Sequence, residues 1–95
     1  MKYLNWNPEK NALLRKERGL GFEDVLYYLE RGGLLADVRN PNNEKYPDQR
    51  ILIVNINDYA YLVPYIETED ELFLKTIIPS RKATGKYLEN DHEKG

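Results

Sequence analysis

The stretch RILIVNINDYAYLVPYI, residues 50–66, predicts the β-hairpin from which the rest of the fold can be worked out. Two runs with the composition of β-strands, Arg50–Ile56 and Tyr59–Ile66, flank the pair Asn57-Asp58. Two residues are the length of a tight hairpin connection, so the runs are predicted to pair antiparallel. Pro64 cannot donate a hydrogen bond to a sheet, which predicts a bulge or an unpaired side in its strand.

Two further runs extend this hairpin. Leu34–Val38 is a short apolar strand candidate, and a loop is predicted for Arg39–Asp48, which is rich in proline and asparagine. Leu72–Ile78 follows the acidic turn Thr68–Glu71 and is the fourth strand candidate. The sequence therefore predicts a mostly antiparallel four-stranded sheet.

Three helices are expected around this sheet. Asn7 as N-cap and Pro8 as first residue begin a helix over 8–18. A second helix over 22–31 has apolar residues at i, i+3, i+4 and i+7, and a terminal helix is predicted for residues 80–90. Helices gathered on one side of an antiparallel sheet give an α+β two-layer domain.

Composition limits the class of protein. The 95 residues, 41% apolar and 32% charged, predict one globular domain over 1–95 with a frayed tail at about 90–95. Without cysteine, signal peptide or an 18-residue apolar run, we expect a cytoplasmic protein that does not span a membrane. The net charge of −2 argues against non-specific coating of nucleic acid, although residues 1–18 carry five cations and two acids.

Few residues are suited to metal or acid–base chemistry. The single histidine, His92, lies in the polar tail and is interpreted as solvated. The acids at 67–71 occupy a turn and point in different directions, so we expect neither a metal site nor a cofactor there. Any acid–base chemistry must therefore use Lys, Arg, Tyr or a carboxylate.

Tyrosines alternate along the run that begins at Tyr59. Tyr59, Tyr61 and Tyr65 share one face of the predicted strand. They either stack on unpaired bases and bind phosphate, or pack beneath the helices as part of the core.

Two cations begin the terminal helix. Arg81 and Lys82 follow the N-cap candidate Ser80, although a helix start already carries partial positive charge. Together with Arg50 and one tyrosine they could form a phosphate-binding cluster. The alternative is an exposed helix start that makes ion pairs with nearby acids.

Three motifs carry a resemblance to a known family. Residues 6–11 (WNPEKN), 21–25 (GFEDV) and 77–84 (IIPSRKAT) occur in the order and positions found in the BrnT family of bacterial toxins, and Arg50 sits like the arginine that opens a strand there. The likeness spans about residues 4–88. The chain thus resembles the BrnT branch of the RelE/ParE-like toxins of type II toxin–antitoxin systems, and the resemblance implies a RelE-like fold.

The resemblance also implies an activity. Such a toxin is a metal-independent endoribonuclease that cleaves mRNA by attack of a ribose 2′-hydroxyl and so inhibits translation. Its partner would be a cognate antitoxin of the ribbon-helix-helix type, through which it would reach DNA only indirectly. The residues implied for catalysis are Arg50, Arg81 and Tyr65, and those implied for RNA binding are Lys10, Lys82 and Tyr61.

An alternative function stays open. A catalytically degenerate protein with the same fold would only bind an antitoxin or regulate transcription with it, which suits the acidic sequence pI of about 5.4. Convergence of Arg50, Arg81 and Lys82 with tyrosines in one open pocket would favour the ribonuclease. A DNA-binding domain in its own right is weaker, because the sequence contains no evident recognition helix.

Overall fold

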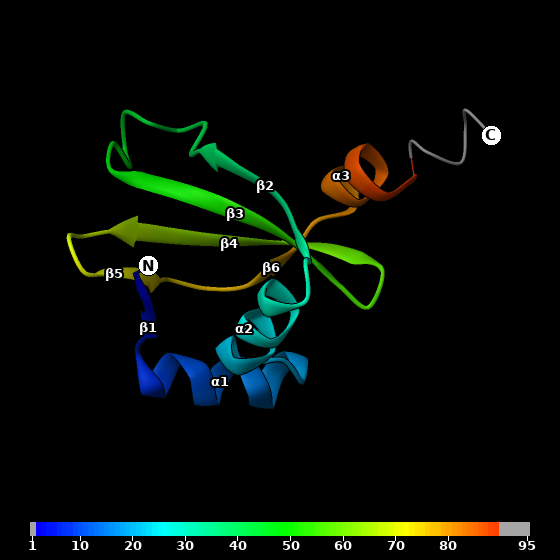
Figure 1. Ribbon diagram of the computed structural model, residues 1–95, viewed down its shortest axis with the longest axis horizontal. Coiled ribbons are helices and arrows are strands. Elements are labelled where there is room, and N and C mark those ends of the chain that lie inside the picture. Colours follow the sequence, from blue (N-terminus) through cyan, green and yellow to red (C-terminus); the bar gives the residue numbers. More distant parts are fainter. Residues whose placement is uncertain (1, 90–95) are drawn as a thin grey trace.

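The computed structural model describes residues 2–89 and places helices on both sides of a twisted sheet (Figure 1). In chain order the elements are β1 (Tyr3–Trp6), α1 (Pro8–Arg18), α2 (Phe22–Glu30), β2 (Leu34–Arg39), β3 (Gln49–Ile56), β4 (Tyr59–Glu67), β5 (Glu71–Leu74), β6 (Ile78–Pro79), α3 (Arg81–Thr84) and the π-helical turn η1 (Gly85–Glu89). The predicted α+β class is confirmed. His92 and the predicted frayed tail lie outside the described residues.

The sheet is mostly antiparallel, as predicted, but the predicted number of four strands was wrong, because within residues 2–89 the sheet has six strands and includes one parallel pair. Its order is β1-β5-β4-β3-β2, with the short β6 also paired to β4. β1 lies parallel to β5, whereas the other pairs are antiparallel. The single strand predicted over Leu72–Ile78 is divided into β5 and β6.

Pro64 accounts for the division of that strand. Its carbonyl accepts a hydrogen bond of 2.8 Å from the backbone N–H of Lys75, just after β5 ends. In an antiparallel strand the N and O of one residue point to the same side, so the missing N–H of Pro64 faces the gap between β5 and β6. The predicted unpaired side at Pro64 is confirmed.

The hairpin between β3 and β4 has the predicted two-residue turn. Asn57 and Asp58 both adopt left-handed backbone, with φ of 56° and 64°. This conformation gives a turn whose twist matches that of the flanking strands. The Asn55 side chain supports it, because Oδ1 accepts the N–H of Asp58 at 2.9 Å.

α1 has its predicted bounds, and α2 ends one residue early at Glu30. Gly21 begins α2 without a capping side chain of its own. The side chain of Asn11 in α1 supplies the missing acceptor, because its Oδ1 binds the N–H of Phe22 at 2.7 Å. α1 therefore caps α2 across the interhelical turn.

The helices are not gathered on one side of the sheet, which corrects the two-layer prediction. Residues of β3 alternate between two cores. Leu52 and Val54 pack with Phe22 and the rest of the α1–α2 side, whereas Ile51 and Ile53 pack with α3. Figure 1 shows α3 across the sheet from α1 and α2.

The segment that follows β6 is fixed to β4 by hydroxyl groups. The predicted N-cap is confirmed, since Ser80 Oγ accepts the N–H of Ala83 at 3.0 Å. Thr84 Oγ1 accepts the N–H of Ala60 in β4 at 2.9 Å and donates to the Ser80 carbonyl at 2.8 Å. The predicted helix is therefore a four-residue α3 continued by η1.

Within residues 2–89 no helix has the length and apolar character needed to cross a bilayer.

Candidate functional site

Arg50 and Tyr65, two of the predicted catalytic residues, lie side by side in the sheet. Arg50 near the start of β3 is the register partner of Tyr65 near the end of β4. Directly opposed residues project to the same face of an antiparallel pair. Both therefore lie on the α1–α2 side of the sheet, at the end away from the β3–β4 turn.

Asp37 of β2 joins this pair. The Tyr65 hydroxyl donates to both carboxylate oxygens of Asp37, at 2.8 and 2.9 Å. Arg50 Nε donates to Asp37 Oδ1 at 3.2 Å, and Arg50 Nη2 donates to the Asp37 carbonyl at 3.1 Å. Three neighbouring strands thus build one polar cluster, Asp37–Arg50–Tyr65, hereafter the strand cluster.

The protonation states in the strand cluster are set by its surroundings. Burial, together with the hydrogen bond to Asp37, raises the pKa of Tyr65, which therefore keeps its proton at neutral pH. The Tyr65 hydroxyl and the Asp37 carboxylate raise the pKa of Arg50. A guanidinium has five N–H donors, and the described part of the chain occupies two of them. Arg50 can therefore still bind an anion.

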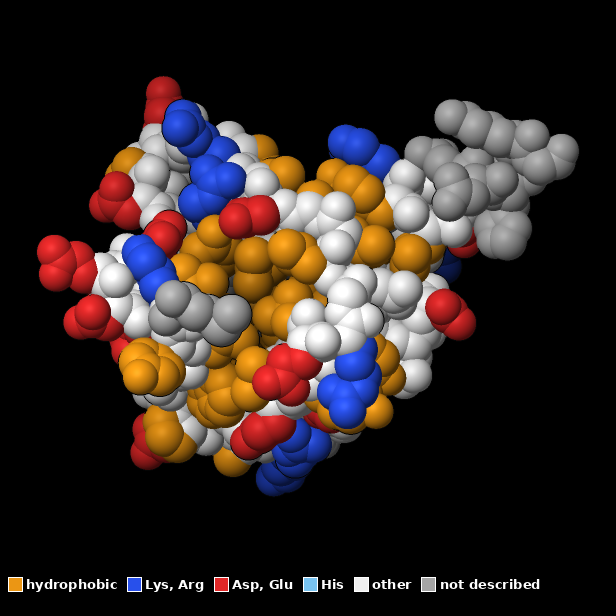
Figure 2. Space-filling view, in the orientation of Figure 1, with side chains coloured by type: hydrophobic (Ala, Val, Ile, Leu, Met, Phe, Trp, Pro, Cys, Tyr) orange, Lys and Arg blue, Asp and Glu red, His pale blue; other side chains and the backbone are white. Residues whose placement is uncertain are grey.

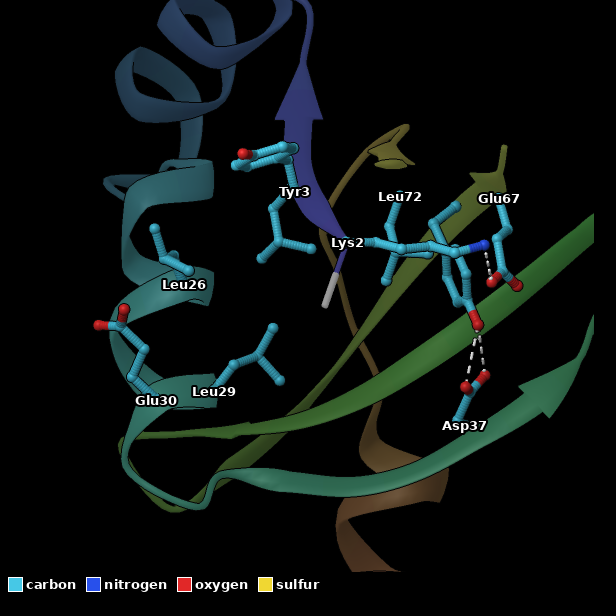
Figure 3. Close-up of a pocket in the computed structure, with 10 residues that line it drawn as sticks. Lys2, Tyr3, Leu26, Leu29, Glu30, Asp37, Glu67 and Leu72 are labelled. Carbon is cyan, nitrogen blue, oxygen red and sulfur yellow. Dashed lines mark hydrogen bonds and ion pairs between the residues drawn. The ribbon is translucent and has the colours of Figure 1, made fainter. Parts of the chain in front are cut away.

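A groove of about 770 Å³ opens beside the strand cluster. Its walls come from α2 and β1, and its floor comes from β4 and β5, as the side chains in Figure 3 show. Most of the lining is apolar, with carboxylates at the edges; the residues are Lys2, Tyr3, Leu4, Leu26, Leu29, Glu30, Asp37, Tyr65, Glu67 and Leu72. Figure 2 shows this hollow as an apolar area with acidic and basic side chains around it.

Arg81 and Lys82 do not join the strand cluster. They begin α3, which packs on the opposite face of the sheet. Both are exposed, and neither has an ion-pair or hydrogen-bonding side-chain partner among residues 2–89. Lys82 instead lines a smaller hollow of about 380 Å³ with Tyr87. The single cationic pocket that would have united Arg50, Arg81 and Lys82 is not formed.

The two remaining predicted residues lie apart from the strand cluster as well. Tyr61 is half-buried against the α1–α2 core and stacks edge-on with Tyr59, their ring centroids 5.7 Å apart. Lys10 lines a hollow of about 400 Å³ between α1 and the end of β5. The tyrosines of β4 were predicted either to stack on bases or to pack beneath the helices. Tyr65 packs beneath the helices, because it is only 2% exposed.

Asp37 was missed by sequence reasoning, which treated residues 34–38 as an apolar strand. The sequence signal that could have revealed this site residue was Asp37 itself, the one carboxylate in the otherwise apolar run 34–38. Asp37 pairs with Leu52, whose side chain belongs to the α1–α2 core, so alternation places Asp37 on the inner face. Among residues 2–89, no group of three or more His, Cys, Asp or Glu side chains is arranged to hold a metal ion.

Comparisons with known proteins bear on the family. No protein-family model, no curated protein and no solved structure matches this chain. The resemblance to the BrnT toxins therefore rests on the motifs at residues 6–11, 21–25 and 77–84, and it stays a prediction.

Proposed function

We propose that this protein is the toxin of a type II toxin–antitoxin pair, a metal-independent endoribonuclease that cleaves mRNA and inhibits translation. The observation that carries the proposal is the strand cluster, in which Asp37, Arg50 and Tyr65 meet at the edge of an open groove. RNA cleavage without histidine needs a base, a cation and a proton donor. The strand cluster offers one group of each kind.

The proposed reaction uses each group once. The Asp37 carboxylate takes the proton of a ribose 2′-hydroxyl, whose oxygen attacks the adjacent phosphorus. Arg50 binds the non-bridging phosphate oxygens with its remaining N–H groups and stabilises the charge of the pentacovalent phosphorane. Tyr65 turns its proton from Asp37 to the leaving 5′-oxygen as the P–O5′ bond breaks. The products are a 2′,3′-cyclic phosphate and a 5′-hydroxyl end.

Three predicted site residues that lie apart from the strand cluster have supporting roles in this proposal: Arg81, which was predicted for catalysis, and Lys82 and Lys10, which were predicted for RNA binding. Arg81 and Lys82 are exposed cations on the α3 side, and Lys10 lies near the end of β5. In the proposal they bind phosphates away from the cleaved bond. The cognate antitoxin, predicted to be of the ribbon-helix-helix type, holds the toxin inactive in the cytoplasm and supplies the contact with DNA.

Expression in a bacterial host tests this proposal. Induction of the wild-type chain should arrest growth, and mapping of cellular mRNA should reveal new 5′-hydroxyl ends. Arg50→Ala should relieve the arrest, whereas Arg18→Ala, which removes an exposed arginine of α1 far from the strand cluster, should not. Growth arrest that persists with Arg50→Ala at equal protein level would show that the wrong residues were chosen.

A second function is supported by a different observation. The predicted cations are divided between two faces of the sheet, and the groove beside the strand cluster is mostly apolar with acids at its edge. These features suit an interaction module that binds a protein and leaves RNA intact. Purified protein that binds an antitoxin but cleaves no RNA would favour this alternative.

A further inference from the structure

The groove beside the strand cluster leaves one helix only partly covered. Leu26 and Leu29 of α2 line the groove and are half-buried, three residues apart on the same helical face. On the opposite wall stands Tyr3 of β1, which is 77% exposed. Half-buried leucines facing an exposed aromatic residue leave a contiguous apolar surface of the kind that marks a protein-binding site.

The charges at the edge of this groove are mainly negative. Glu30, Asp37 and Glu67 line it together with Lys2, and Arg50 lies beside it against Asp37. Lys2 pairs with Glu67 and Arg50 pairs with Asp37, so the negative charge that no ion pair balances at this edge is that of Glu30. Glu30 has no hydrogen-bond or ion-pair partner in the part of the chain that the structure describes, residues 2–89.

This charge distribution selects among the possible occupants of the groove. Two copies meeting through the same face would place acids against acids, since a two-fold interface is self-complementary. A nucleic-acid strand laid along the α2 wall would bring phosphates toward Glu30, whereas the RNA contact proposed above lies at Arg50, outside the groove lining. A peptide segment that carries lysine or arginine beside its apolar residues avoids both kinds of repulsion, because its cations attract the acids of the groove.

We propose that the groove is a docking site for an amphipathic, cationic segment of a partner protein. Its apolar side chains lie against Leu26, Leu29 and Tyr3, and its cations pair with Glu30 and Asp37. A segment seated in this way covers the Tyr65 hydroxyl and competes with Arg50 for Asp37. Docking does not depend on RNA cleavage; only the consequence, inhibition of the ribonuclease, rests on the proposed function.

A selection experiment tests the chemistry of the occupant. The purified full chain is used to select from a phage-displayed library of random peptides of about sixteen residues. Enriched peptides should combine leucine-type or aromatic residues with an excess of lysine and arginine. Enrichment of acidic peptides, or of none, overturns the proposal.

Variants of the chain test the location. Binding of the enriched peptides, made synthetically and followed by fluorescence anisotropy, should weaken about tenfold or more with Tyr3→Ala and with Glu30→Lys. Both changes are at exposed positions and leave the core intact, which circular dichroism checks. The matched controls are Tyr46→Ala, in the β2–β3 loop, and Glu17→Lys, on α1; both should bind like the wild type.

Three other outcomes have defined meanings. Peptides that bind Tyr3→Ala and Glu30→Lys unchanged overturn the assignment to this groove. Self-association in analytical ultracentrifugation that Tyr3→Ala abolishes would instead identify a second copy as the occupant, and so also overturns it. Cleavage of RNA by the chain alone is measured separately, so absent cleavage with intact peptide binding refutes the proposed ribonuclease but not the docking site.

Discussion

Removing the hydroxyl of Tyr65 is the most informative single change to the strand cluster. Tyr65→Phe keeps the buried ring, which is part of the α1–α2 core, and deletes only the donor to Asp37. No other described side chain donates to Asp37 except Arg50. The effect on folding can therefore be assigned to the interactions of this one hydroxyl within the strand cluster.

The expected loss follows from the geometry of that bond. A hydrogen bond to a charged group contributes about 1.5–3 kcal/mol net to the free energy of unfolding. The Asp37 side chain is 40% exposed, so water competes for its carboxylate and the lower end of the range applies. We expect a loss of about 1.5 kcal/mol, which corresponds to a melting temperature lower by roughly 6–12 °C in a domain of this size.

Urea unfolding followed by circular dichroism measures this loss, and the same strand offers a matched control. Tyr61→Phe removes a hydroxyl that has no hydrogen-bond partner among residues 2–89, so its free energy of unfolding should change by less than about 0.5 kcal/mol. Asp37→Asn combined with Tyr65→Phe completes a double-mutant cycle that reports the coupling. Equal stability of Tyr65→Phe and Tyr61→Phe would refute the hydrogen bond.

The same pair of proteins gives a pH test. The folded state raises the pKa of Tyr65, so it favours the protonated phenol. The resulting stabilisation is fully present below the pKa of the unfolded chain, about 10, and is lost as the pH rises through the higher pKa of the folded state. The wild type should therefore lose its advantage over Tyr65→Phe above about pH 10. A difference that stays constant up to pH 11 would contradict this assignment.

Other changes test the supporting structure. Asn11→Ala should lower the free energy of unfolding by about 1–2 kcal/mol, measured in urea, because the first N–H of α2 loses its acceptor and Glu23 loses one donor. Thr84→Val should lower it by about 1–3 kcal/mol in the same assay, because a buried backbone N–H of β4 is left unpaired; a smaller loss would mean that α3 is held in another way. Hydrogen bonds from Arg15 and Asn11 lower the pKa of Glu23 in the folded state. The ionised Glu23 therefore adds to the free energy of unfolding at neutral pH, and this addition should disappear as the pH falls through the lowered pKa. Acid unfolding curves of Glu23→Gln should lack this loss of stability. Arg81→Ala should leave stability unchanged within about 0.5 kcal/mol and reduce the salt dependence of RNA binding by about one phosphate contact, as a gel-shift series in salt would show.

Local signals in the sequence predicted the elements that are determined locally. Asn7 and Pro8 fix the start of α1, and the pair Asn57-Asp58 fixes the β3–β4 hairpin because both residues tolerate left-handed backbone. Once that hairpin is known, its register alone places Arg50 opposite Tyr65. Two of the three residues of the strand cluster were therefore accessible from the turn.

The remaining features depend on contacts between distant parts of the chain. The parallel pairing of Tyr3–Trp6 with Glu71–Leu74 has no signature within either segment. The position of α3 on the far face depends on β6 and on the bond between Thr84 and Ala60, which joins residues 24 positions apart. A cluster of Arg81 and Lys82 with Arg50 was possible from the sequence, because the sequence did not specify the face of the sheet on which α3 would pack. In the structure α3 packs on the face opposite to Arg50.

One measurement tests the central claim, that the strand cluster cleaves RNA. The purified chain is incubated with end-labelled RNA in EDTA, and the product ends are identified. We predict metal-independent cleavage with 2′,3′-cyclic phosphate and 5′-hydroxyl ends, reduced about a hundredfold or more in Arg50→Ala and unchanged in Arg18→Ala. No cleavage by the folded wild-type chain, or undiminished cleavage by folded Arg50→Ala, would contradict it.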